Sequence, residues 1–169
     1  RYINSWMDFK WIEDTRLAMK QLAKEGFKFV IITNQAGVAR GVTDSLELEK
    51  IHHNIVSELK KDNIDILSIY SCQHHWDDEC NCRKPKAGMF FKASQDFALR
   101  LDQTIYIGDD IRDCQAAFNA GTKCIFIGND KELKNIAQEM MPIFSTKNLS
   151  ECVSNIIEHF NSINRNDYN

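Results

Sequence analysis

Four side chains that could bind a metal ion stand close together in the middle of the chain: Cys72, His74, Cys80 and Cys82. They follow the pattern C-x-H-x5-C-x-C, in which two ligand pairs with the same spacing are joined by a short loop. Structural zinc takes four such ligands in a tetrahedron, so the pattern predicts a closed structural zinc site. His75 is an alternative ligand, although the repeated one-residue spacing favours His74. His75 and Trp76 would then lie at the rim, where they could face a substrate.

Two cations, Arg83 and Lys84, follow this loop directly. A guanidinium group can grip an anion with two parallel hydrogen bonds, and an ammonium group adds a compact positive charge. A metal clamp that fixes the loop would also fix both cations. The arrangement therefore predicts a site for an anionic group such as phosphate, and the alternative is a solvated surface pair.

The composition is that of an ordinary globular chain, with 43% hydrophobic and 27% charged residues among 169. A net charge of −3 gives no general attraction to nucleic acid, and no apolar run has membrane-spanning length. We expect a monomer without a nucleic-acid or membrane partner. Beyond the cluster, Cys114, Cys124 and Cys152 stand in apolar contexts. A metal site with buried free thiols favours a reducing compartment, so we expect the protein in the cytoplasm.

Strands and helices are expected to alternate along the chain. The apolar run FKFVIIT (27–33) predicts a strand buried on both faces. Further strands are expected at 66–71, 104–107, 123–127 and near Ile143. Helices are expected at 14–25, after a cap at Thr43 or Asp44, and at 88–99, 111–120, 131–140 and 149–161. Short connections between such elements predict an α/β fold: a three-layer, Rossmann-like parallel sheet with helices on both faces. We expect one domain over 1–161 and a frayed polar tail over 162–169.

Polar residues follow three of the predicted strands. In parallel sheets, ligands bind beyond the carboxyl ends of the strands. Thr33-Asn34-Gln35 ends one strand, Cys72 ends a second and Asp109-Asp110 ends a third. A hydroxyl and backbone N–H groups at a strand end can cradle a phosphoryl group, although a threonine there can also be a plain turn residue. The three segments predict one functional edge of the sheet.

The acidic segment Gly108–Asp113 opens a predicted helix. Asp109 is expected to bind a hard cation such as Mg²⁺, which prefers oxygen ligands. One of these carboxylates could instead be a helix N-cap. Asp110 is a further candidate ligand, and Asp113 is expected to anchor the loop. Elsewhere, Arg40 lies in a glycine-bearing loop, where it could contact substrate or form a surface salt bridge.

Three segments together resemble the haloacid-dehalogenase-like (HAD-like) phosphatases. They are VIITNQAGVARG (30–41), the C-x-H…C-x-C-R-K-P loop and YIGDDIRDCQAAFNAG (106–121). Within this family they are most similar to the branch that removes the 7-phosphate of D-glycero-D-manno-heptose 1,7-bisphosphate in surface-polysaccharide and lipopolysaccharide precursor synthesis. The related histidinol-phosphate phosphatases share the zinc loop.

The resemblance implies Mg²⁺-dependent hydrolysis of a sugar phosphate monoester, with a structural zinc ion. Thr33 and Lys84 would stabilise the transferring phosphoryl group, and Asp109 would complete the Mg²⁺ shell. The residues that would bind substrate are Asn34, Gln35, Ala36, Arg40, Arg83 and Asp110. The heptose branch tends to carry a basic residue at the position of Asp110, which leaves the identity of the sugar open.

The family's attacking aspartate, from a D-x-D-G-[TV] motif on its first strand, has no counterpart in residues 1–169. Residues 1–13 resemble the segment just beyond that motif. We therefore expect the first, central strand to lie upstream of Arg1. The alternatives are a histidinol-phosphate phosphatase, a catalytically inactive module that binds a sugar phosphate or a protein, and, more distantly, a nucleic-acid 3′-phosphatase.

Overall fold

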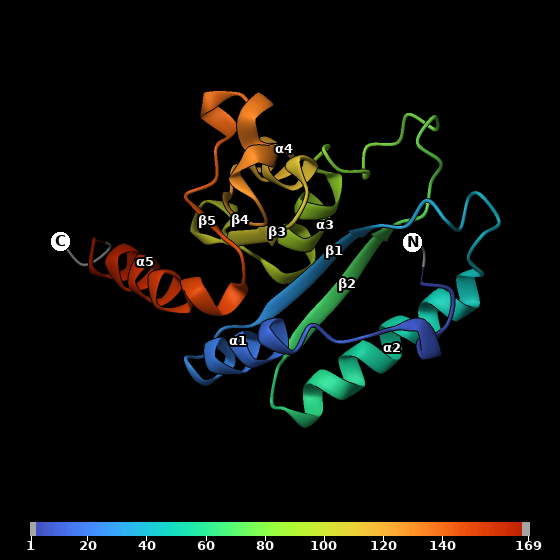
Figure 1. The fold of residues 1–169 in the computed structure, drawn as a ribbon, viewed down its shortest axis with the longest axis horizontal. Coiled ribbons are helices and arrows are strands. Elements are labelled where there is room, and N and C mark those ends of the chain that lie inside the picture. Colours follow the sequence, from blue (N-terminus) through green and yellow to red (C-terminus); the bar gives the residue numbers. More distant parts are fainter. Residues whose placement is uncertain (1–2, 167–169) are drawn as a thin grey trace. The chain divides into compact units, whose positions relative to one another are not determined.

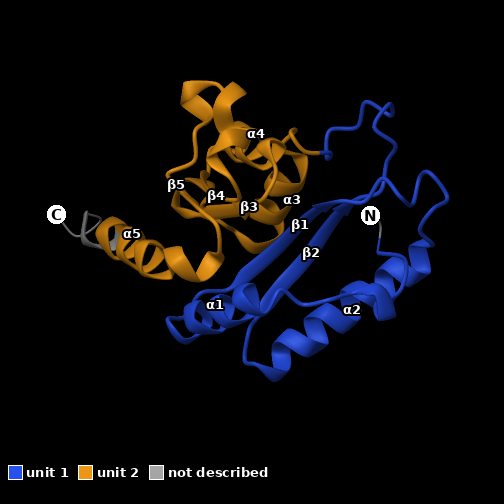
Figure 2. Ribbon diagram, viewed as in Figure 1, with its two compact units in different colours: residues 1–83 blue, residues 84–169 orange. Residues whose placement is uncertain are grey.

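The structure is a computed structural model that describes residues 3–166, with the side chains of residues 3–163. The chain divides into two compact units, Arg1–Arg83 and Lys84–Asn169 (Figure 2), and each is described by itself. Whether the units make up the single domain expected over 1–161 stays a prediction. Within the described residues, no helix is both long and apolar enough to cross a bilayer.

The first unit holds a pair of parallel strands and two long helices (Figure 1). Its elements are η1 (Trp6–Asp8), α1 (Glu13–Lys24), β1 (Phe29–Asn34), α2 (Ser45–Lys61) and β2 (Ile66–Cys72). In the register of the two strands, Asn34 lies opposite Cys72. The carboxyl ends of β1 and β2 therefore lie at the same edge, as expected for the segments that carry the candidate site. The side chain of Asp44, one of the two expected caps, accepts hydrogen bonds from the first turn of α2.

The two helices of this unit are joined by apolar packing and by an ion-pair network. Leu59, Ile64 and Ile66 are buried and pack against half-buried residues of α1, α2, β1 and β2. At the end of α2, Asp62 accepts hydrogen bonds from Arg16 (2.6 Å) and Lys20 (3.3 Å) of α1. These hydrogen bonds, chiefly that from Arg16, lower the pKa of Asp62 below its ordinary value.

Because folding lowers the pKa of Asp62, its charge stabilises the folded state above about pH 4 and ceases to do so as the pH falls through the lowered pKa. We expect Asp62→Asn to be less stable than wild type at pH 7 and the difference to shrink as the pH is lowered below about 4. Urea unfolding at a series of pH values measures both effects. An equal difference at every pH would show that the charge of Asp62 does not contribute.

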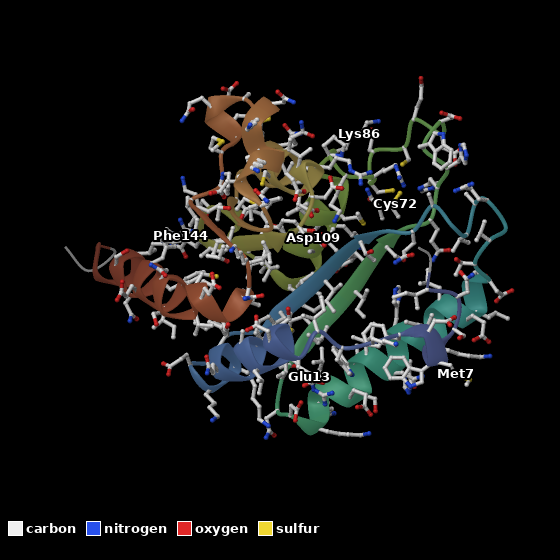
Figure 3. The ribbon with its side chains drawn as sticks, viewed as in Figure 1. Met7, Glu13, Cys72, Lys86, Asp109 and Phe144 are labelled. Atoms are coloured by element: carbon white, nitrogen blue, oxygen red, sulfur yellow. The ribbon has the colours of Figure 1, made fainter. Side chains whose placement is uncertain are left out.

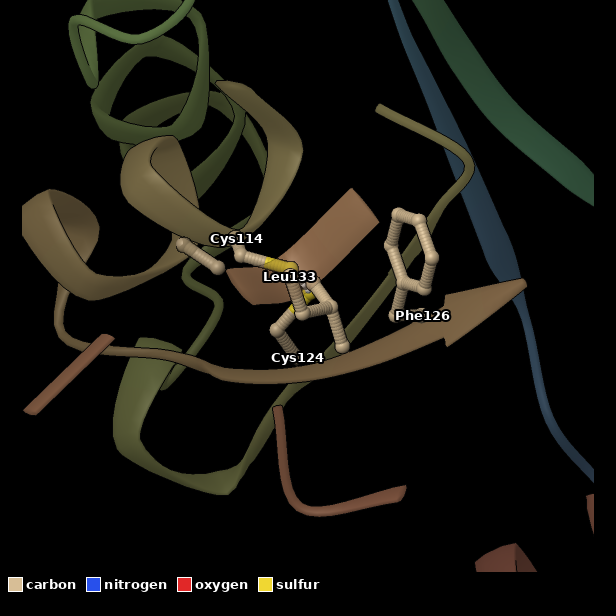
Figure 4. Packing of buried hydrophobic residues seen from close by; sticks show 5 residues of the cluster. Cys114, Cys124, Phe126 and Leu133 are labelled. Carbon is tan, nitrogen blue, oxygen red and sulfur yellow. Dashed lines mark hydrogen bonds between the residues drawn. The ribbon is translucent and has the colours of Figure 1, made fainter. Parts of the chain in front are cut away.

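The second unit holds a three-stranded parallel sheet in the order β3-β4-β5. Its main elements are α3 (Gly88–Phe97), β3 (Ile105–Gly108), α4 (Ile111–Ala120), β4 (Lys123–Ile127), β5 (Phe144–Thr146) and α5 (Val153–Asn166). The short 3₁₀ helices are η2 (Leu101–Gln103), η3 (Asp130–Asn135), η4 (Gln138–Met140) and η5 (Leu149–Cys152). Five buried side chains form the core between α4, β4 and η3 (Figure 4): Cys114, Ala117, Cys124, Phe126 and Leu133.

The α/β class and the parallel pairing of the strands are confirmed. The expectation of buried, free thiols at Cys114, Cys124 and Cys152 is also confirmed. The five strands form two sheets and not one. Apolar patterns in a sequence do not reveal which strands exchange backbone hydrogen bonds.

Three local expectations need correction. The strand β1 is half-buried along its length and not fully buried, since β2 is its only paired neighbour in the described part of the chain. The helix expected at 131–140 is a pair of 3₁₀ turns, because Leu133 is the only side chain there that is buried, and an α-helix needs a continuous apolar stripe. The last helix begins later, at Val153, and continues to Asn166. The remainder of the expected tail, 167–169, lies outside the described residues.

Candidate active site and metal clamp

The four predicted metal ligands lie together in the first unit. One ligand atom from each of Cys72, His74, Cys80 and Cys82 lies within 4.8 Å of the other three. Cys72 is the last residue of β2 and is completely buried, so it anchors the cluster to the sheet. Figure 3 labels it where β2 runs into the loop. The other three ligands come from the loop that leads to Arg83.

Two of the three closest separations in the cluster match those of a tetrahedral zinc site. A tetrahedron with zinc–sulfur bonds of about 2.3 Å and zinc–nitrogen bonds of about 2.0–2.1 Å separates its ligand atoms by roughly 3.5–3.8 Å. The Sγ atoms of Cys72 and Cys80 are 3.7 Å apart, and Sγ of Cys72 is 3.6 Å from Nδ1 of His74. Nδ1 of His74 is 3.1 Å from Sγ of Cys82. The donor set, three sulfurs and one imidazole nitrogen, is one that structural zinc uses.

The structure also shows which of the two neighbouring histidines belongs to the cluster. His74 turns Nδ1 into the cluster, whereas His75 belongs to the turn outside it. The backbone N–H of His75 donates to Asp78 Oδ2 at 2.7 Å, and its ring nitrogen lies 3.2 Å from Asp77 Oδ2. His74 is therefore the residue placed to bind a metal, in agreement with the repeated spacing in the sequence.

The segment after β1 is tied to the clamp through the backbone. The N–H of Gln35 donates to the carbonyl oxygen of Cys72 at 2.7 Å. The following residues close on themselves, because Arg40 N–H donates to Ala36 and the N–H groups of Val42 and Thr43 donate to Gly37. The predicted substrate segment 34–41 is thus a compact turn whose base is attached to Cys72, one of the predicted metal ligands.

Thr33 is the last residue but one of β1, and its hydroxyl is oriented by a neighbour. The side-chain amide of Gln35 donates a hydrogen bond to Thr33 Oγ1 at 3.1 Å. An oxygen that accepts one hydrogen bond can still donate its own proton. The hydroxyl of Thr33 is therefore suited to donate to an anionic oxygen.

At the outer end of this turn, Arg40 lies over an aromatic ring of the clamp loop. The guanidinium carbon of Arg40 is 5.0 Å from the centre of the Trp76 ring, within the range of a cation–π contact. Arg40 itself is exposed, and Trp76 is 51% exposed. The residue therefore has an aromatic partner, whereas the sequence left a substrate contact and a salt bridge open.

Arg83 ends the first unit with a buried cationic nitrogen. Nη1 of Arg83 is buried and has no hydrogen-bond partner among the described residues. A buried charged donor without an acceptor is costly, and an anionic group is the partner that would satisfy it. This is the position at which the sequence predicts contact with substrate.

The second unit begins with Lys84, whose ammonium group is held by two side chains. Nζ of Lys84 lies 2.6 Å from Asp113 Oδ1 and donates to the hydroxyl of Tyr106 at 2.9 Å. The side chains of Lys84 and Asp113 are only 12% and 5% exposed. Burial, followed by the negative charge of Asp113, raises the pKa of Tyr106 far above its ordinary range, so this hydroxyl stays protonated.

The other oxygen of Asp113 holds the loop that carries Asp109 and Asp110. Oδ2 accepts a hydrogen bond from the backbone N–H of each of these residues, both at 3.1 Å. One carboxylate therefore fixes both the lysine and the acidic loop, and the prediction that Asp113 anchors the loop is confirmed.

Asp109 and Asp110 have different environments. Asp109 is exposed at the carboxyl end of β3 (Figure 3). Asp110 is the N-cap of α4 and forms a capping box with Asp113. Its carboxylate also pairs with Arg112 at 2.6 Å, and the hydrogen bond from Arg112 lowers the pKa of Asp110 to about 2. The N-cap alternative is thus observed for Asp110, and its contact with substrate stays a prediction.

Gly108 is required by the close approach of Asp113. A Cβ atom at residue 108 would lie 2.4 Å from Cβ and Oδ2 of Asp113, a distance at which something must move. We expect Gly108→Ala to lower the free energy of unfolding by about 2 kcal/mol or more, as overpacking of a buried site does, measured by urea unfolding. Gly41→Ala is the control, because no atom lies within 4 Å there and only the strain of a positive φ (+64°) remains. Equal losses in the two variants would contradict a steric role.

Tyr106 is the site residue that the sequence analysis did not identify. Its hydroxyl bridges the ion pair, since it accepts from Lys84 and lies 3.3 Å from Asp113 Oδ1, to which it donates. The available signal was a single polar atom in the otherwise aliphatic strand IYIG, two residues before the glycine.

Two family models match this chain. The model described as polynucleotide kinase 3 phosphatase matches residues 2–115, and the HAD-hydrolase-like model matches residues 81–152. The chain is 31% identical over 157 residues to the D-glycero-alpha-D-manno-heptose-1,7-bisphosphate 7-phosphatase of Campylobacter jejuni, which covers 88% of this chain and 90% of the relative. It is 36% identical over 129 residues to the D-glycero-beta-D-manno-heptose-1,7-bisphosphate 7-phosphatase of Haemophilus ducreyi, covering 72% and 71%.

Solved structures of phosphatases also superpose on this chain. The D,D-heptose 1.7-bisphosphate phosphatase from B. bronchiseptica, complexed with magnesium and phosphate, superposes with a TM-score of 0.83 at 26% identity and covers 94% of this chain and 89% of its own. A putative HAD-like phosphatase from Mesorhizobium loti has a TM-score of 0.70 at 20% identity, with 90% and 75% coverage, and shares the fold.

Proposed function

This chain belongs to the haloacid-dehalogenase-like phosphatases, and from that premise we propose that it removes the 7-phosphate of D-glycero-D-manno-heptose 1,7-bisphosphate. The family membership makes it a phosphoric monoester hydrolase. Heptose bisphosphate is the substrate in the names of relatives that are 31–36% identical to this chain. These relatives include enzymes for both anomers, so the proposal covers the alpha and beta forms.

The single observation that carries the proposal is that the carboxylate of Asp113 binds two parts of the candidate site at once. Its carboxylate holds Lys84 through Oδ1 and the backbone of Asp109 and Asp110 through Oδ2. The buried ammonium group and the backbone of the exposed Asp109 are thereby attached to the same side chain, at the end of a parallel strand. Phosphoryl transfer requires this combination, because the cation offsets the charge on the phosphoryl oxygens while the carboxylate can hold a metal ion.

The cation proposed for this loop is Mg²⁺. Asp109 presents a hard oxygen donor at the carboxyl end of β3, and Mg²⁺ is commonly held by one or two carboxylates together with phosphate oxygens and water. The residues present therefore fit the ion, with Asp109 as its ligand. When bound, Mg²⁺ would add positive charge at the phosphoryl oxygens.

Residues from the end of β1 to Arg83 are proposed to bind and orient the substrate. The Thr33 hydroxyl, oriented by Gln35, would donate to a phosphoryl oxygen. The buried Nη1 of Arg83 would donate to an anionic group of the substrate. Asn34, the backbone at Gln35 and Ala36, Arg40 and Asp110 are proposed as further contacts. The attacking carboxylate implied by the resemblance is not among residues 1–169.

The cluster of three cysteines and His74 is proposed to bind structural zinc. Its four ligand atoms would occupy all four positions of a tetrahedral ion and leave no position open for a substrate. When bound, zinc would cross-link the end of β2 to the loop that carries Arg83. Zinc thiolates and free buried thiols persist in a reducing environment, so we propose that the enzyme is located in the cytoplasm. We also propose that it is a monomer.

A second candidate, a nucleic-acid 3′-phosphatase, is favoured by one specific observation: the polynucleotide kinase 3 phosphatase model matches residues 2–115. A net charge of −3 argues against it, because nucleic-acid binding proteins depend on clustered positive charge. The proposal accordingly includes no nucleic-acid partner and no membrane partner.

The deciding experiment measures phosphate release from a substrate panel by the protein expressed from its complete natural gene. The panel holds both anomers of heptose 1,7-bisphosphate, histidinol phosphate and a 3′-phosphorylated oligonucleotide. We expect kcat/KM for one heptose anomer to exceed that for the last two substrates by at least about 10²-fold. A preference for histidinol phosphate or the oligonucleotide would assign the corresponding alternative, and no hydrolysis of any substrate would favour the inactive binding module.

A further inference from the structure

Two loops of the first unit are connected at both ends. At the base, Gln35 N–H donates to the carbonyl oxygen of Cys72 at 2.7 Å. At the outer end, the guanidinium group of Arg40 lies 5.0 Å from the centre of the Trp76 ring. Of the two partners, Cys72 is a proposed metal ligand at the end of β2, and Trp76 lies in the loop between the ligands His74 and Cys80.

The aromatic partner is itself held in place by short-range contacts. The rings of Trp76 and His75 lie with their centres 4.0 Å apart. His75 is fixed by the turn that follows, through its backbone hydrogen bond to Asp78 Oδ2 at 2.7 Å. Trp76 is therefore part of an ordered turn, although half of its surface is exposed.

We infer that Trp76 is a positioning residue for Arg40, which makes the clamp loop part of the substrate-recognition apparatus. This inference rests on the proposed function. A guanidinium group that lies against an indole uses its flat face for the contact and keeps its N–H donors in the plane of the group, where they can bind an anion. The stack thus restricts the rotamers of a long side chain without using its donors, which lowers the entropy lost when an anionic substrate binds.

A structural explanation of the Trp76–Arg40 contact makes a different prediction. Both side chains are largely exposed, and an exposed cation–π contact contributes only about 0.5–1 kcal/mol. A purely structural contact would therefore affect stability slightly and substrate binding not at all. A positioning role would affect the KM for a phosphorylated sugar more than kcat.

The experiment compares wild type with Trp76→Ala, Trp76→Phe, Arg40→Ala and the Trp76→Ala/Arg40→Ala double variant. We expect Trp76→Ala to raise the KM for heptose 1,7-bisphosphate about 2- to 10-fold with a smaller change in kcat. Trp76→Phe should recover much of the loss, because a phenyl ring retains a π face. The double variant should have a KM close to that of Arg40→Ala, since the tryptophan acts through the arginine. Phe91→Ala, which removes an aromatic ring of similar exposure (54%) from α3, is the control and should change neither constant.

A second readout is independent of turnover. The Nε–H resonance of Arg40, assigned by its loss in Arg40→Ala, is expected to show a ring-current shift in wild type and in Trp76→Phe and to lose it in Trp76→Ala. Titration with inorganic phosphate should move this resonance, with weaker binding in Trp76→Ala. If the protein hydrolyses no heptose bisphosphate, the proposed function fails while the phosphate titration still decides the inference. An unshifted wild-type resonance, additive effects of the two alanine substitutions on KM, or equal phosphate affinity in wild type and Trp76→Ala would overturn it.

Discussion

Replacing Lys84 with alanine is expected to lower kcat/KM by on the order of 10²-fold or more, the usual effect of removing one group that stabilises charge in the transition state. The same substitution leaves Asp113, whose side chain is 5% exposed, without its cation. Breaking a buried ion pair in this way costs about 3–5 kcal/mol. We therefore expect a folded but less stable protein, measured by phosphate release and by urea unfolding.

A double substitution separates the effect of Lys84 on activity from its effect on stability. In the Lys84→Met/Asp113→Asn variant, the buried negative charge is absent, while the amide oxygen of the introduced asparagine can still accept from the N–H groups that Asp113 Oδ2 binds. We expect much of the stability to return while the activity stays low. Recovery of activity together with stability would show that Lys84 acts only by supporting the loop.

Lys92 offers a matched control for the loss of a lysine. Its ammonium group pairs with Asp96 at 2.6 Å, the same distance as the Lys84–Asp113 pair, but its side chain is 58% exposed. Exposed pairs of this kind contribute roughly 0.3–0.5 kcal/mol. Lys92→Ala should therefore retain both activity and stability. Nearly wild-type activity in Lys84→Ala would rule out the role proposed for Lys84.

The sequence was sufficient to place three of the candidate site residues at or next to strand ends. Thr33, Cys72 and Asp109 could be located because apolar runs mark the strands and the chain becomes polar where each run ends. The grouping of the four candidate metal ligands could be predicted because they are close in sequence, so the local spacing alone restricts their geometry. The helix α4 could be placed because Asp110 and Gly121 stand at its two ends with typical capping roles.

Contacts between distant segments could not be predicted in the same way. The hydroxyl of Tyr106 meets Lys84 22 residues away, and nothing in a strand pattern indicates that partner. The stack of Arg40 on Trp76 likewise depends on how two loops fold beside each other. The helix expected at 131–140 failed for a different reason: amino-acid preferences favoured a helix, but only Leu133 is buried there, with the half-buried Ile136 packed against the same core, which is too little for a stable α-helix.

The second large effect is expected when one of the four proposed zinc ligands is replaced. We expect Cys80→Ala to lower the zinc content of protein purified without chelators from about one ion per chain to well below one. Because the binding free energy of a structural zinc ion contributes to folding, stability should fall by several kcal/mol. Activity should fall as well, since the clamp fixes the loop that ends in Arg83 and, through the Cys72 carbonyl oxygen, the turn that begins at Gln35. Zinc is measured by elemental analysis and stability by thermal unfolding.

Cys152→Ala separates the loss of a ligand from the loss of a buried thiol. Cys152 is completely buried and lies outside the cluster, in the second unit. Its replacement should cost about 1–3 kcal/mol, as the removal of buried atoms typically does, while the zinc content stays at one per chain. Chelator treatment of wild type should then reproduce the stability loss of Cys80→Ala, and added zinc should restore the wild type but not the variant. If wild type contains no zinc, or if Cys80→Ala keeps a full equivalent of the ion, the four residues are not a zinc clamp, and another interaction must hold the loop between β2 and Arg83.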